Sequence, residues 1–88
     1  GEELMALIAE IGQMRHLSPD DAEVGNKVRR LQEHITANFY TCTKEILAGL
    51  GQMYVSDDRF RRNIDEYGGE GTAEFASAAI AAYCGSAV

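Results

Sequence analysis

Apolar residues recur every three or four positions along most of this chain, and no segment alternates apolar with polar residues. That spacing places them on one face of an α-helix, whereas a strand would need a period of two. Five stretches carry such a stripe: about 3–16, 18–39, 44–54, 56–68 and a last one from Thr72 to Tyr83. The sequence therefore predicts an all-α fold of about five helices in one small domain, residues 1–88.

Several helix boundaries are predicted from residues that favour helix ends. Ser18, Ser56 and Thr72 are expected to be N-caps, and Gly68-Gly69 is expected to end the fourth helix. A bend is expected at residues 41–43. Opposite charges four residues apart are expected to support the fourth helix, in the pairs Asp57–Arg61, Asp58–Arg62, Arg61–Asp65 and Arg62–Glu66.

Length and charge exclude several classes of partner. The chain has 88 residues, enough for one core without disulfides or metals. Its 14 acidic and 8 basic side chains give a net charge of −6, which repels nucleic-acid phosphates and anionic lipids. No apolar run is long enough to span a bilayer, and no signal-like segment opens the chain. We expect a cytoplasmic domain that contacts neither nucleic acid nor membrane directly.

Residues that could carry out chemistry are scattered. His16, His34, Cys42 and Cys84 lack the spacing of a metal or haem site, so no metal or cofactor is expected. Nothing in the spacing of Cys42 and His34 puts them on one helical face, and no enzyme activity is expected. If a helix restarts at Thr41, Cys42 would lie in its first turn, where the helix dipole lowers a thiol pKa. We favour the alternative, a small buried apolar residue.

Two features of the third helix allow a structural and a functional interpretation. Gly49 and Gly51 interrupt its stripe; they serve either close helix packing, which we favour, or room for a ligand. Aromatic and sulfur-containing side chains also gather around this helix, as in permissive apolar clefts, although core packing explains most of them.

A longer stretch of the sequence resembles a known family. Residues 51–60, Gly-Gln-Met-Tyr-Val-Ser-Asp-Asp-Arg-Phe, followed by Asn63-Ile64-Asp65, resemble the TipAS domain, the antibiotic-recognition part of certain MerR-type transcription activators. The similarity extends upstream through Asn38, Tyr40 and Cys42, and more loosely through the Pro19-Asp20 turn to both ends of the chain.

The resemblance implies a globin-like helical fold whose broad cleft binds thiopeptide antibiotics such as thiostrepton, with broad specificity. It also implies that binding is relayed to a DNA-binding domain through a dimerising coiled coil, two parts that are absent from this chain. The isolated domain is then expected to be a monomer and the full-length protein a dimer. The family's domain begins further upstream, in a segment thought to order on binding, most of which this chain is expected to lack.

The thiostrepton-binding member of the family has two cysteines in this region, and here Cys42 matches one while Gly49 stands at the other. Reversible contact is therefore expected in place of a covalent bond. The ligand site is expected where the third helix meets the second and fourth. Its predicted residues are Phe39, Tyr40, Cys42, Leu47, Leu50, Met53, Tyr54 and Phe60.

A rival hypothesis assigns the chain to another class, the protein-interaction modules. In that case the alanine-rich last helix would dock a partner helix or a second copy of the chain, without any small-molecule ligand.

Overall fold

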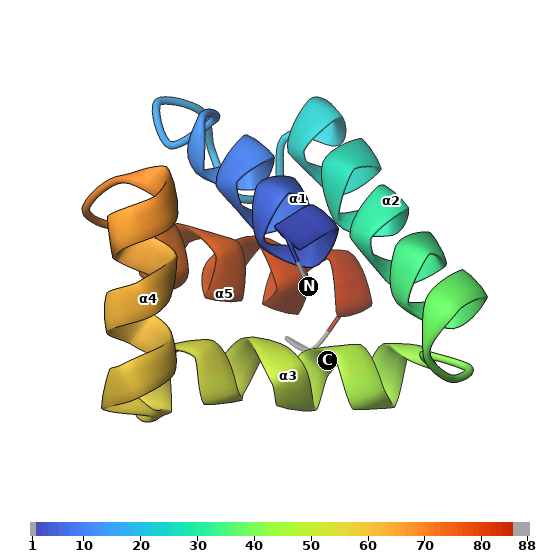
Figure 1. Ribbon diagram of the computed structural model, residues 1–88. Helices are drawn as coiled ribbons and strands as arrows, with labels where there is room; N and C mark the ends of the chain where they lie inside the picture. The colour runs from blue at the N-terminus through green and yellow to red at the C-terminus, as the bar shows by residue number, and fades with distance from the viewer. Residues whose placement is uncertain (1, 86–88) are drawn as a thin grey trace.

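The computed structural model describes residues 2–85, and this range folds into five helices (Figure 1). They are α1 (Glu2–Gly12), α2 (Ala22–Asn38), α3 (Lys44–Ser56), α4 (Asp58–Gly68) and α5 (Thr72–Cys84). In Figure 1, α1 and α2 lie side by side, α4 turns sharply away from the end of α3, and α5 crosses behind α1. The predicted all-α class with about five helices is confirmed.

The last helix, α5, is the centre of the domain, since it packs against each of the other four helices. Its buried face consists mainly of alanine, whose small side chain allows neighbouring helices to approach closely. The buried residues of α5 are Thr72, Ala73, Ala76, Ala79 and Ile80. The alanine-rich face that the rival hypothesis assigns to a partner is thus covered by the chain's own helices.

Two glycines lie at the contacts with α5. A Cβ atom on Gly51 of α3 would lie 3.0 Å from Ile80 Cγ2, and one on Gly12 of α1 would lie 2.5 Å from Thr72 Oγ1. The packing interpretation of Gly51 is therefore confirmed. A Cβ on Gly49 would meet nothing within 4 Å, so close packing does not explain that glycine.

The helix starts differ from the predicted ones because aspartates, not serines, supply the caps. Asp21 Oδ1 accepts a hydrogen bond from the Glu23 N–H at 2.8 Å, and α2 begins after it, so the predicted cap Ser18 is wrong. Asp57 Oδ1 accepts from two backbone N–H groups at the start of α4, and Ser56 is the last residue of α3. A carboxylate also complements the positive end of the helix dipole.

The predicted cap Thr72 is wrong as well, because it is the first residue of α5 and its side chain points elsewhere. Asp65 of α4 accepts the hydrogen bond of the Ala73 N–H at 2.9 Å. The Arg15 guanidinium donates to Thr72 Oγ1 at 2.6 Å and to the Gly68 carbonyl oxygen at 3.0 Å. Arg15 thereby joins the α1–α2 connection to the α4–α5 connection.

Other boundaries follow the sequence more closely. α4 ends at Gly68, and Gly69 has a positive φ of 104°, as predicted for this glycine pair. The expected break at 41–43 is present, with Thr43 as the N-cap of α3. α1 is shorter than predicted, because residues after Gly12 form turns.

The ion pairs also differ from the prediction. Within residues 2–85 they are Lys27–Glu10 and Arg61–Glu74, so the four pairs expected along α4 do not form. Arg61 reaches across to α5 instead.

Alanine substitutions at two glycines should have opposite effects on stability. Gly12→Ala places a methyl group against the buried Thr72 side chain and should lower the free energy of unfolding by about 1–3 kcal/mol. Gly25→Ala, in α2 with nothing within 4 Å of the added carbon, should raise it by about 0.5–1 kcal/mol. Urea unfolding followed by circular dichroism measures both, and equal effects would contradict the packing described for α1 and α5.

Candidate ligand pocket

An apolar pocket of about 220 Å³ opens between the first four helices. α1 forms one wall, α3 and the start of α4 form the opposite side, and the end of α2 with the following connection completes it. The lining residues are Leu4, Met5, Ile8, Ile35, Phe39, Tyr40, Leu50, Met53, Tyr54, Phe60 and Ile64. Every lining side chain is uncharged, so the pocket favours an apolar and neutral group.

The mouth of the pocket is aromatic and unusually exposed. Phe39, Tyr40 and Phe60 have 56%, 49% and 42% of their surface exposed, whereas Ile8 and Ile64 are almost fully buried. Phe39 packs edge-on against the His34 ring, with ring centroids 6.1 Å apart, and Phe60 lies 6.3 Å from the Tyr54 ring. Large apolar side chains left in water around a cavity are a usual mark of a binding surface.

The contacts described above place these side chains. Gly51 lets one face of α3 pack closely against Ile80 of α5. Leu50, Met53 and Tyr54 of the same helix line the pocket. The Asp57 cap starts α4 immediately afterwards, which places Phe60 at the mouth. α2 ends at Asn38, and the two aromatic residues that follow form the opposite part of the rim.

Six of the eight predicted site residues line this pocket. They are Phe39, Tyr40, Leu50, Met53, Tyr54 and Phe60. The structure places Cys42 and Leu47 elsewhere, buried in the core and outside the lining. A fully buried side chain such as Leu47 has no surface to offer a ligand in this conformation.

The sequence prediction missed the contribution of α1. Leu4, Met5 and Ile8 form a wall of the pocket, and Ile35 and Ile64 add to it from α2 and α4. Their helical spacing was visible in the sequence, but a stripe facing a core and a stripe facing a cavity have the same period. Only the packing of α1 against α2, α4 and α5 distinguishes them.

Cys42 occupies a structural position. Its N–H donates to Thr36 Oγ1 at 3.0 Å and its carbonyl oxygen accepts from Gln32 Nε2 at 2.8 Å, which fixes the α2–α3 connection. Burial raises the pKa of the Cys42 thiol. Because Thr43 is the N-cap, Cys42 precedes the helix and does not lie in its first turn. The activating environment considered for this cysteine is therefore not formed.

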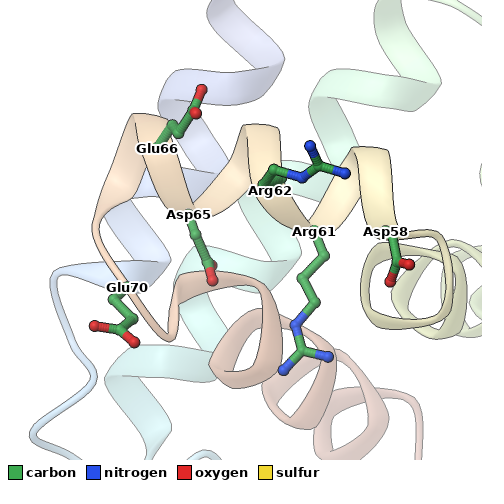
Figure 2. Close-up of a pocket in the computed structure, with 6 residues that line it drawn as sticks. All are labelled: Asp58, Arg61, Arg62, Asp65, Glu66 and Glu70. Atoms are coloured by element: carbon green, nitrogen blue, oxygen red, sulfur yellow. The ribbon is translucent and has the colours of Figure 1, made fainter.

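A second, larger depression lies along α4 and is charged. Asp58, Arg61, Arg62, Asp65, Glu66 and Glu70 line it. Figure 2 shows that the first five leave α4, and Glu70 the connection after it, in different directions rather than converging. Two of them have structural partners, since Asp65 caps α5 and Arg61 pairs with Glu74. The arrangement fits a solvated helix face, and we assign no site to it.

Two other kinds of site are absent from residues 2–85. In that range no helix combines the length and apolarity needed to cross a membrane. The same residues contain no group of three or more His, Cys, Asp or Glu side chains placed to hold a metal ion.

The fold and the pocket together define a small all-α domain with an uncharged, apolar pocket between its first four helices. The chain belongs to the TipAS antibiotic-recognition domain family, whose model matches residues 1–83. No solved structure matches it, so the globin-like arrangement stays a prediction.

The chain is similar to parts of named transcriptional activators. It is 44% identical over 72 residues to the HTH-type transcriptional activator mta of Bacillus subtilis (strain 168), which covers 82% of this chain and 27% of that protein. It is 53% identical over 34 residues to the HTH-type transcriptional activators TipA of Streptomyces coelicolor and Streptomyces lividans, covering 39% of this chain and 13% of theirs. The chain thus spans a minor part of these relatives.

The two cysteines should react slowly in the folded protein, and Cys42 more slowly than Cys84. Both thiol pKa values are raised, mainly by burial, so little thiolate exists near neutral pH; Cys84 is the more exposed of the two. In a Cys84→Ser variant, Cys42 should react with a disulfide reagent at pH 7.5 at least roughly tenfold more slowly than in urea, and its rate should climb as the pH rises. In a Cys42→Ser variant, the same experiment gives the reaction rate of Cys84.

A Cys42 rate in the folded protein equal to that in urea would contradict both the burial and the raised pKa.

Proposed function

We propose that this chain is the effector-binding domain of a transcriptional activator and that its apolar pocket binds amphiphilic, thiopeptide-type ligands. The observation that carries this proposal is the cavity of about 220 Å³ with uncharged walls and an exposed aromatic mouth. Membership in a family described as antibiotic-recognition domains supports a small-molecule ligand. Binding, not catalysis, is the proposed role, since the lining residues contain no acid, base or nucleophile that could act together.

The proposed complex is formed partly inside the pocket and partly over its rim. A thiopeptide macrocycle is larger than a cavity of this size, so only one apolar group enters between α1 and α3. The remainder lies against Phe39, Tyr40 and Phe60, whose exposed rings provide flat apolar contacts. The six predicted residues in the lining, together with Leu4, Met5 and Ile8, form the proposed contact set. Leu47 and Cys42 support it from the core.

We propose that the response to ligand binding takes place in a longer protein that contains this chain. The similar proteins are named as HTH-type transcriptional activators, and this chain matches only part of each. We propose that the DNA-binding part and a dimerising coiled coil lie outside this chain, which is itself a cytoplasmic monomer. A ligand that binds one arrangement of the helices more tightly would shift the population of that arrangement, and the attached parts would respond to the shift.

Substitutions one helical turn apart on α3 test the proposal. Leu50 lines the pocket, whereas Ile46 is an exposed apolar residue outside it. Leu50→Gln removes apolar contact and should weaken thiostrepton binding about tenfold or more, while Ile46→Gln should leave the affinity within about twofold. Isothermal titration calorimetry gives both affinities. The proposal fails if the wild-type protein binds neither thiostrepton nor a smaller thiopeptide. It also fails if the two substitutions weaken the binding affinity by the same factor.

A further inference from the structure

Two lining residues of the pocket, Tyr40 at the exposed mouth and the nearly buried Tyr54, carry a hydroxyl, and that of Tyr54 stands out. The Tyr54 side chain belongs to α3, is only 3% exposed, and lies against the ring of Phe60. The lining residues with which it shares the cavity are aliphatic, sulfur-containing or aromatic. A phenol hydroxyl in such surroundings normally has a hydrogen-bond partner, since an unpaired buried polar group is unfavourable.

Other polar side chains in the interior of the domain do have partners. The buried Thr72 Oγ1 accepts from Arg15, and even the half-buried Tyr83 hydroxyl donates to Gln32 Oε1 at 2.7 Å. The Tyr54 hydroxyl, in contrast, makes no hydrogen bond to any atom of residues 2–85.

The hydroxyl of Tyr54 nevertheless keeps contact with open space. Within the described residues, no fully buried side-chain oxygen or nitrogen lacks a partner, so this unpartnered oxygen cannot be fully enclosed. Tyr54 is otherwise packed in the core, and the cavity is the open space that it lines. Its donor and its acceptor positions therefore have no partner within residues 2–85, in a side chain that lines the cavity.

The residues around the Tyr54 hydroxyl also determine whether a charged or a neutral ligand group can enter the pocket. Burial, with smaller contributions from Tyr40 and Cys42, raises the pKa of Tyr54 to about 12, so the phenol stays protonated and can donate. No lining residue carries a charge that could compensate an ion inside the cavity. A charged ligand group would lose its hydration without gaining a counter-ion, whereas a neutral acceptor would gain a hydrogen bond.

We infer that the Tyr54 hydroxyl is the polar anchor of this pocket and donates a hydrogen bond to an uncharged acceptor, such as a carbonyl oxygen, on the apolar group that enters. This inference rests on the proposed function and specifies its ligand class: neutral, compact apolar groups with one hydrogen-bond acceptor. The walls select for apolar shape, and Tyr54 selects for the acceptor.

A matched pair of probes and a matched pair of variants test the anchor. 2-Acetylnaphthalene carries a carbonyl acceptor, and 2-isopropylnaphthalene has nearly the same shape without one. Tyr54→Phe should weaken binding of the ketone about tenfold and leave that of the hydrocarbon within about twofold. Tyr40→Phe, which removes a hydroxyl at the exposed mouth, should leave the ratio of the two affinities unchanged. Amide shifts of the pocket residues in proton–nitrogen spectra give the four comparisons.

Each outcome decides the inference. Equal changes for both probes in Tyr54→Phe, or a loss of the preference in Tyr40→Phe instead, would overturn the anchor while leaving the pocket as a binding site. Failure of wild type to bind either probe would overturn the pocket and the anchor together.

The stability of the unliganded protein separates an anchor from a structural tyrosine. Because the hydroxyl has no partner within residues 2–85, Tyr54→Phe should have the same urea midpoint as wild type or a higher one. A clearly lower midpoint would show that the hydroxyl has a partner in the chain and would contradict the inference.

Discussion

The close approach of α1 and α3 to α5 is the contact on which the rest of the domain depends. Gly12 and Gly51 lack the Cβ atoms that would collide with Thr72 and Ile80, and the alanines of α5 leave space for its neighbours. With four helices packed around this small-residue core, the faces of α1 and α3 turned toward α4 and the end of α2 enclose the pocket. The cleft is thus a consequence of the same packing that stabilises the fold.

Helical periodicity was sufficient to predict the class and the number of helices, because each stripe has the spacing of a buried helix face. Helix starts were less predictable. Ser18 and Ser56 are good caps in isolation, but Asp21, three residues after Ser18, and Asp57, directly after Ser56, cap instead. The cap of α5 comes from Asp65, on another helix, and no local pattern identifies such a tertiary contact.

Predicting the site relied on a resemblance for the expectation of a ligand, and on the apolar and aromatic residues where the third helix meets the second and fourth for its location. The predicted residues on α3 and at both of its ends that line the pocket are close together in the sequence and carry large apolar or aromatic side chains. The wall from α1 was missed, since Leu4 and Met5 are far from those residues in sequence and meet them only through packing. Cys42 was included on the resemblance and on a possible place in a first helical turn, whereas its burial in the α2–α3 connection makes it structural.

The central claim is that the cavity between α1 and α3 receives the ligand, and the three methionines of the chain test it directly. Met5 and Met53 line the cavity from opposite sides, whereas Met14 packs against the core outside it. With methionine methyl groups labelled with carbon-13, intermolecular Overhauser effects from bound thiostrepton should reach Met5 and Met53 but not Met14. Contacts at Met14 alone, or none at Met5 and Met53 in a saturated complex, would contradict the account.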